Sequence, residues 1–88
     1  MDQKLKQDLE IGSAIRALRM ERHMTQEQVI SKLQLMDINI TRSIYSQIEG
    51  GTYSIRISVL AGLAQLFGVD YNAFFQNISL PEADKNHA

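Results

Sequence analysis

The segment TRSIYSQ of this 88-residue chain, which starts at Thr41, concentrates side chains that can donate or accept hydrogen bonds. In the major groove, arginine can donate two hydrogen bonds to guanine, glutamine can pair with adenine, and hydroxyl groups reach several base edges. Arg42, Gln47, Thr41 and Ser43 supply these groups. Ile44 lies beside them and could contact a thymine methyl group. These five residues are the candidate base-reading set.

The same segment has a plainer interpretation, in which its polar side chains only face water. Tyr45 and Ile48 are one helical turn apart and should face a core. Ile44 precedes Ile48 by four residues and could pack inward with it, which would leave Arg42 and Gln47 as solvated surface. Composition alone favours this second interpretation, so the neighbouring elements must decide.

Capping residues mark two helices around this segment. Thr41 is a good N-cap, and the helix should stop at residues 50–51, two glycines, because glycine adopts the left-handed conformation without a Cβ penalty. Thr25 and Gln28 form a capping box for the preceding helix. Met24 and Val29 are at the positions of the matching hydrophobic staple.

Three further helices follow from apolar spacing and from Gly68 and Asp70, which should end one helix and cap the next. Their apolar residues are Ile11, Ile15, Leu18, Ile57, Leu60, Leu63, Ala64, Phe67, Phe74 and Phe75. We therefore expect an all-α, compact domain of five short helices and no sheet over residues 9–78. A polar segment, 1–8, should precede it, and a disordered polar tail, 79–88, should follow.

Composition limits the remaining functions. The chain has no cysteine, and no apolar run is long enough to cross a bilayer, so we expect a cytoplasmic protein without a membrane partner. The formal net charge of −1 argues against a strongly basic nucleic-acid binder. Between residues 14 and 58, however, basic residues outnumber acidic ones by six to four, so the middle of the chain is mildly basic. The basic residues are Arg16, Arg19, Arg22, Lys32, Arg42 and Arg56, and the acidic ones are Glu21, Glu27, Asp37 and Glu49.

Candidate catalytic and metal-binding groups are few. His23 and His87 are the only histidines, and each is best interpreted as a surface residue. Glu27 and Glu49 are single carboxylates with structural explanations, so no acid–base pair can be argued. We expect no enzyme activity, no metal and no cofactor.

Three segments together resemble the Cro and C1 repressor-type domain, also called the Xre family. They are IGSAIRALRMERHMTQEQV, ITRSIYSQIEGG and VLAGLAQLFGVDYNAFF, and the resemblance covers residues 11 to about 75. It implies a five-helix, lambda-repressor-like DNA-binding domain with a helix-turn-helix. The third helix, at about residues 41–49, would enter the major groove of double-stranded DNA.

The resemblance also implies roles for individual residues. Thr41, Arg42, Ser43, Ile44 and Gln47 fall where such domains touch bases and adjoining phosphates. Residues expected to contact phosphate or to position the domain are Thr25, Gln26, Ser46 and Arg56. Among them, Gln26 resembles the family's glutamine that contacts phosphate and supports the recognition helix. Arg19 and Glu49 match an arginine and a glutamate that pair in many relatives, and this pair would fix the angle of the third helix.

The chain departs from the family pattern at three places. Residues 34–38 look like a five-residue insertion before the third helix, with Asn39 at the position of the usual turn glycine. Gly50 and Thr52 stand where basic residues often follow the glutamate, and Ile55 replaces a proline. We therefore expect fewer phosphate contacts from this loop, with Arg56 as a substitute.

Two functions remain open. The first is a sequence-specific DNA-binding transcriptional regulator, more often a repressor in this family, acting as a homodimer on a palindromic operator. Its dimer contact would involve the fifth helix, the N-terminal segment, or DNA alone, with Tyr71 or Phe75 contributing. The second is a protein-interaction module on the same fold, antitoxin-like or a modulator of another regulator, with weak or no DNA binding.

Overall fold

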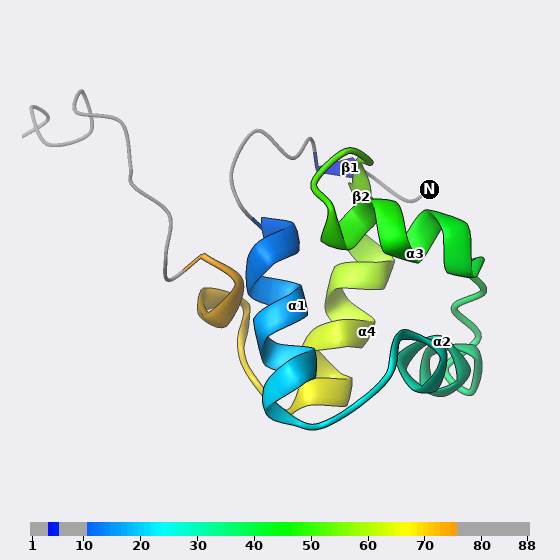
Figure 1. Cartoon of the computed structure of the whole chain (residues 1–88), viewed down its shortest axis with the longest axis horizontal. Helices are drawn as coiled ribbons and strands as arrows, with labels where there is room; N and C mark the ends of the chain where they lie inside the picture. Colours follow the sequence, from blue (N-terminus) through cyan, green and yellow to red (C-terminus); the bar gives the residue numbers. More distant parts are fainter. Residues whose placement is uncertain (1–3, 6–10, 76–88) are drawn as a thin grey trace, which may run out of the picture.

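A computed structural model of the chain describes residues 4–5 and 11–75 (Figure 1). The tail at 79–88 and most of the segment at 1–8 lie outside the described residues, as do both ends of the domain expected at 9–78. In chain order the elements are β1 (Lys4–Leu5), α1 (Ile11–Glu21), α2 (Gln26–Gln34), α3 (Arg42–Glu49), β2 (Ile55–Arg56), α4 (Ile57–Phe67) and the 3₁₀ helix η1 (Tyr71–Phe74).

Two features of the expected architecture are wrong. The described residues form four α-helices, because the fifth expected helix is a single 3₁₀ turn, η1. Asp70 does cap it, as expected, by accepting a hydrogen bond of 3.0 Å from the Asn72 backbone N–H. The expectation of no sheet also fails, because β1 pairs antiparallel with β2, with Leu5 opposite Ile55. Strands of two residues are too short to show the alternating pattern by which a sequence reveals a sheet.

All four α-helices end in the same left-handed turn. The residue with positive φ is His23 after α1, Asp37 after α2, Gly51 after α3 and Gly68 after α4. Each turn is closed by the next backbone N–H, which donates to the carbonyl five residues earlier; Ile38 to Leu33, at 3.0 Å, is one example. Of the two glycines expected to stop α3, Gly50 is its C-cap in the α region and Gly51 is left-handed. Before α3 the left-handed residue is Asp37, whereas Asn39, at the position of the family's turn glycine, is not left-handed.

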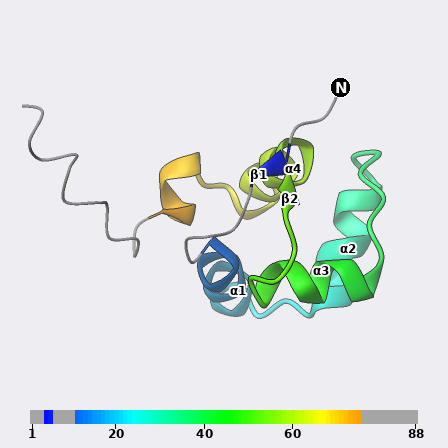
Figure 2. The same ribbon diagram turned by 90° about the horizontal axis from the view of Figure 1, so that it is seen from above.

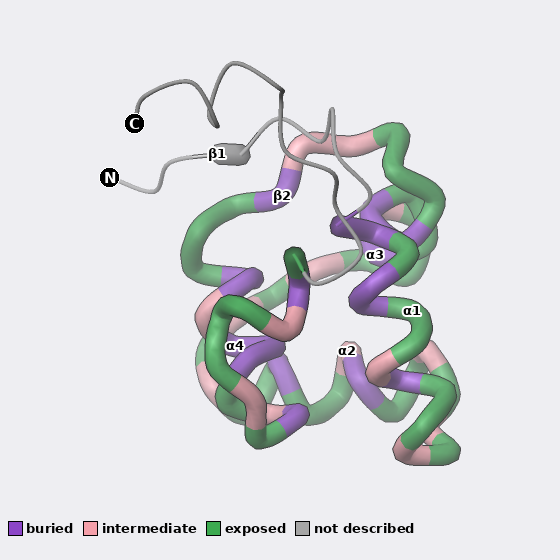
Figure 3. The backbone as a smooth tube through the Cα atoms, turned by 90° about the vertical axis from the view of Figure 1, so that its left-hand side faces the viewer, coloured by how far each residue is buried: buried purple, intermediate pink, exposed green. Residues whose placement is uncertain are grey.

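The helices surround one apolar core, to which each of them contributes (Figure 3). Its largest fully buried side chains are Tyr45, Phe74, Ile15, Leu33, Ile48, Ile55, Leu63 and Val29. The capping box expected at the start of α2 is present, with both of its hydrogen bonds between Thr25 and Gln28. Met24 is half-buried against the core and Val29 is buried, which is consistent with the expected hydrophobic staple. Phe75, one of the two residues considered for a dimer contact, is 37% exposed.

A close backbone contact places α3 against α1. A Cβ atom on Gly12 would lie 2.7 Å from the Glu49 carbonyl oxygen and closer still to that of Ile48, so no larger residue fits there without moving α3. Gly62 plays the corresponding part for α4, since a Cβ there would meet the side chains of Ile38 and Leu33. The position of α3 is therefore set by small residues in its neighbours as well as by its own core residues.

Candidate nucleic-acid interface

Helix α3 lies along one side of the molecule, between α1 and α2 and away from η1 (Figure 2). Its inner face is buried and consists of Tyr45, Ile48 and Glu49. Its outer face is exposed and carries the polar residues Thr41, Arg42, Ser43, Ser46 and Gln47. The α3 helix therefore presents one continuous strip of hydrogen-bonding side chains to solvent.

The five candidate base-reading residues do not share one environment. Thr41 caps α3, because its hydroxyl accepts a hydrogen bond of 3.1 Å from the Ile44 backbone N–H. The Gln47 amide donates to the Ser43 hydroxyl at 3.4 Å, so these two side chains lie together on the exposed strip. Ile44 is half-buried and packs against the core, which is the arrangement that the alternative interpretation describes. Four of the five side chains are thus exposed, and Ile44 is the exception.

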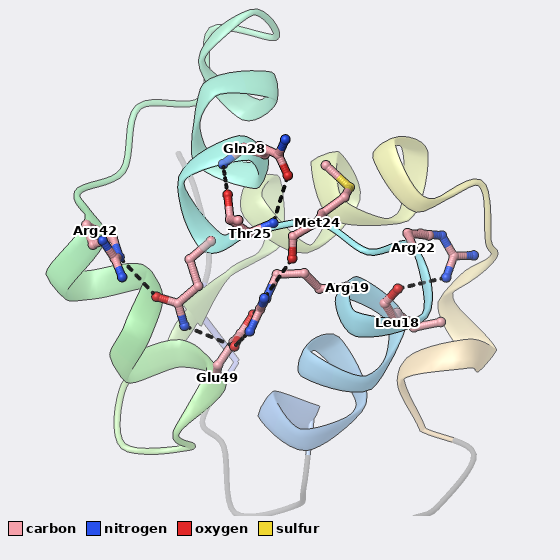
Figure 4. Close-up of polar contacts among 9 residues, drawn as sticks. Leu18, Arg19, Arg22, Met24, Thr25, Gln28, Arg42 and Glu49 are labelled. Atoms are coloured by element: carbon pink, nitrogen blue, oxygen red, sulfur yellow. Dashed lines mark hydrogen bonds and ion pairs between the residues drawn. The ribbon is translucent and has the colours of Figure 1, made fainter.

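A buried ion pair joins α3 to α1 (Figure 4). The Arg19 Nε donates to Glu49 Oε2 at 2.7 Å, and its Nη2 donates to Glu49 Oε1 at 2.9 Å. The third guanidinium nitrogen donates to the Met24 carbonyl oxygen at 2.8 Å, just before α2. Two parallel hydrogen bonds fix both distance and orientation, so this pair holds the end of α3 at a set angle. The structure thus brings together the two residues expected to pair.

The surroundings of Glu49 determine its ionisation. Burial alone would raise its pKa, but interactions with Arg19, Tyr45 and Gln26 outweigh that effect, so the pKa lies below its ordinary value. Burial, and then the neighbouring Glu49 carboxylate, raise the pKa of Tyr45. The Tyr45 hydroxyl makes no hydrogen bond of good geometry within the described part of the chain, so it acts on Glu49 as a nearby dipole. Glu49 is therefore held as a carboxylate.

The network continues from the buried pair to the exposed strip. The Gln26 amide nitrogen donates to Glu49 Oε1 at 3.1 Å, and its amide oxygen accepts from Arg42 Nε at 3.3 Å. Arg42 also donates through Nη1 to Glu27 Oε2 at 3.2 Å. Because Gln26 is anchored at one end, it orients the Arg42 guanidinium at the other. The resemblance implied that Gln26 supports the third helix, whereas nothing in the sequence indicated the contact between Glu27 and Arg42, which joins different helices.

Arg22 is a structural residue that the sequence did not reveal. Its Nε donates to the Phe67 carbonyl oxygen at 3.0 Å, and its Nη1 donates to the Leu18 carbonyl oxygen at 2.9 Å. The guanidinium also lies 5.4 Å from the centre of the Phe67 ring. Arg22 therefore donates to carbonyl groups near the carboxyl ends of both α1 and α4.

The other expected contact residues lie around α3. Thr25 is exposed at the start of α2, where its hydroxyl accepts from the Gln28 backbone N–H at 3.1 Å. Ser46 lines a shallow groove between α1 and α3 together with Arg16. Arg56 is exposed in β2 and shares a cleft with Thr41. Among the described residues, Arg16 and Arg56 have no ion pair, so their charges are available to a partner.

Within the described ranges, no group of three or more acidic, histidine or cysteine side chains is arranged to hold a metal ion. In the same residues, no helix has the length and apolar character needed to span a bilayer.

Four short helices, with an exposed α3 braced against α2, define a helix-turn-helix domain. A family model described as a helix-turn-helix domain matches residues 12–80, and the chain belongs to this family. No curated protein and no solved structure shows significant similarity to the chain.

Proposed function

We propose that the protein is a sequence-specific DNA-binding transcriptional regulator of the Cro/C1 type, without catalytic activity. One observation carries the proposal: the exposed strip of α3 presents Arg42, Ser43 and Gln47, and the end of the same helix is fixed by two hydrogen bonds from Arg19 to Glu49. Helix-turn-helix domains insert such a helix into the major groove. Arg42 and Gln47 then read base edges, and Ser43 adds a hydroxyl contact.

The contact between Arg42 and Glu27 has a consequence for this function. In the free protein, the Arg42 guanidinium is shared between Gln26 and Glu27. To bind the acceptors of a guanine, Arg42 must leave the Glu27 carboxylate but can keep Gln26 as its support. Both side chains of the ion pair are largely exposed, so the separation costs little, roughly 1 kcal/mol or less.

The remaining expected contacts position the domain on the phosphate backbone. Gln26 and Thr25 at the start of α2, Ser46 beside Arg16, and Arg56 in β2 all border α3 or its supports. Such contacts set register and orientation but carry no sequence information. With two protomers, recognition helices about 34 Å apart would contact successive major grooves of a palindromic operator, as a repressor would.

Selection of bound sites from random duplex DNA tests the proposal. We expect a short inverted repeat to be enriched, and Arg42→Ala to lose roughly tenfold or more in affinity for it and to relax one base position. Lys32→Ala is the matched control, because Lys32 is an exposed cation of α2 that forms no ion pair within the described residues. Failure to enrich any sequence at low salt would refute the proposal.

The second candidate, a protein-interaction module, is favoured by the acidic group on the same face. Glu27 contacts Arg42 at 3.2 Å, and the net charge of the chain is −1, so the face is less basic than that of a strongly basic DNA-binding protein. Leu35, which is 86% exposed at the end of α2, offers an apolar contact. Retention of function after Arg42→Ala and Gln47→Ala together would support this module over the regulator.

A further inference from the structure

A cleft of about 240 Å³ lies beside the start of α3. Its lining comes from three stretches: the connection between α2 and α3, helix α3 itself, and residues 53–59. Ile48 and Val59 form a buried floor, and Ile38, Ile40 and Ile44 are half-buried around it. The core is therefore incompletely closed at this point, and its open side is lined by branched apolar side chains.

The size and lining of the cleft suit a small molecule. An apolar cavity of roughly 150 Å³ can hold a molecule the size of benzene, so this cleft has room for a short branched chain. Small-molecule sites are mostly apolar, with a few polar groups that orient the ligand. Here Ser54, Arg56 and Ser58 line the cleft at alternate positions of one polar segment, and Asp37, Asn39 and Thr41 line it from the connection between α2 and α3.

The polar segment favours an anion. Arg56 has no ion pair within the described ranges, and its planar guanidinium suits the two oxygens of a carboxylate. The hydroxyl group of Ser54 adds hydrogen-bonding capacity in the same cleft. One acidic residue, Asp37, lines the cleft from the connection between α2 and α3, and it disfavours ligands with more than one negative charge.

We propose that this cleft binds a small amphipathic monocarboxylate, with its branched apolar end on the isoleucines and its carboxylate on Arg56. The site is assigned on its own geometry and does not depend on DNA binding. A second step rests on the proposed function: the bound carboxylate would neutralise Arg56, which we expect to contact phosphate, and would therefore weaken binding to DNA. The ligand would thus act as a negative effector.

Methyl and amide NMR titration of the full chain tests the site without DNA. The probe is 4-methylpentanoate, and its matched controls are the neutral 4-methylpentanamide and the cationic 4-methylpentylamine. We expect saturable shifts at the methyl groups of Ile38, Ile40 and Ile44 with the acid, at concentrations up to roughly 10 mM. The amide should bind more weakly by roughly threefold to fivefold, since an exposed charged contact contributes modestly.

Two variants locate the carboxylate. Arg56→Gln should reduce the affinity for the acid by roughly threefold to fivefold and abolish its advantage over the amide. Lys32→Gln, a change at an exposed cation outside the cleft, should leave both affinities unchanged. The site is refuted if no probe gives saturable shifts, if the amine binds better than the acid, or if Arg56→Gln retains the preference for the acid.

A separate DNA-binding assay tests the effector step. With an enriched duplex, the acid should weaken binding of the unchanged protein roughly threefold and should have no effect on Arg56→Gln, whose own affinity is lower. If the acid binds in the NMR titration but DNA affinity is unchanged, the site stands and the effector step is wrong. If no duplex is enriched at all, the proposed function fails while the NMR result still decides the site.

Discussion

At the scale of single residues, Arg19 makes the contacts on which the orientation of α3 depends. Its guanidinium bonds to both Glu49 oxygens and to the Met24 carbonyl oxygen. Removing one partner of a buried pair leaves the other charge without compensation, which costs several kcal/mol. We expect Arg19→Met to lower the free energy of unfolding by about 3 kcal/mol, measured by urea denaturation followed by circular dichroism.

Matched variants separate this effect from a general loss of an arginine. Arg16 is exposed on the same helix, and Arg16→Met should change the free energy of unfolding by less than about 0.5 kcal/mol. The double variant Arg19→Met with Glu49→Leu should be more stable than Arg19→Met alone, because no buried charge remains unpaired. Equal losses for Arg16→Met and Arg19→Met would contradict the role assigned to the pair.

Glu49 also gives the stability a dependence on pH. Its pKa in the folded chain lies below the ordinary value of 4.5, so the unfolded chain binds the proton first as the pH falls. The stabilisation is therefore fully present above pH 4.5 and is lost as the pH drops through the folded pKa. Glu49→Gln should be less stable than the unchanged protein near neutral pH, and the difference in urea midpoints should shrink below pH 4.5.

Glu21→Gln provides the control for this comparison. Glu21 is exposed and its only described ion pair, with Arg22, spans 3.4 Å, so its loss should have little effect on the midpoint at neutral pH. A difference between Glu49→Gln and the unchanged protein that stays constant down to about pH 3 would contradict the lowered pKa.

At the scale of elements, the left-handed residue that follows each α-helix is glycine after α3 and α4 but not after α1 and α2. Asp37 is left-handed with φ of 63°, a conformation that costs a residue with a Cβ about 1–2 kcal/mol. Asp37→Gly should therefore raise the free energy of unfolding by about 0.5–1 kcal/mol, after the larger entropy of glycine in the unfolded chain is subtracted. Thermal unfolding measures the change.

Asn39→Gly is the informative control, because Asn39 aligns with the family's turn glycine but is not left-handed here. Without strain to relieve, this change should lower the free energy of unfolding by about 0.5–1 kcal/mol. If Asn39→Gly stabilised the protein and Asp37→Gly did not, the turn would lie where the resemblance alone placed it.

Local signals in the sequence predicted the elements well where one residue acts on its close neighbours. Thr25, Thr41 and Asp70 cap the helices that follow them, and Gly68 ends α4, as expected. The left-handed turn at Asp37 was not predicted, because the resemblance placed Asn39 at the turn glycine and both residue types tolerate that conformation. Its position is decided by Ile38, which packs against Gly62 of α4, a contact between distant segments.

The candidate site was predicted less completely, for the same physical reason. Residue types and helical spacing were enough to place Arg42, Ser43 and Gln47 on one exposed strip, and resemblance paired Arg19 with Glu49. The bracing of Arg42 by Gln26 and Glu27, and the use of Arg22 by α1 and α4, depend on how the helices pack. Spacing along one helix carries no information on side chains that another helix brings near.

At the scale of the whole molecule, the packing decides how many charges remain for DNA. Arg19 and Arg22 are used inside the fold. Three exposed arginines border α3: Arg42 in the helix, Arg16 across the groove that holds Ser46, and Arg56 across the cleft that holds Thr41. A dimer would thus neutralise roughly six phosphates, and the logarithm of affinity should fall against the logarithm of salt concentration with a slope of about 5.

That slope follows from the number of arginines, so it can be changed one position at a time. Arg16→Gln removes one cation from each protomer and should reduce the slope for a dimer by about 2, with little loss of sequence preference, because phosphate contacts do not read bases. Lys32→Gln removes an exposed cation of α2 that forms no ion pair in the described part of the chain, and it should leave the slope unchanged. Fluorescence anisotropy at a series of salt concentrations measures both. A slope near 10, or equal changes for the two variants, would mean that DNA contacts reach well beyond the surface around α3.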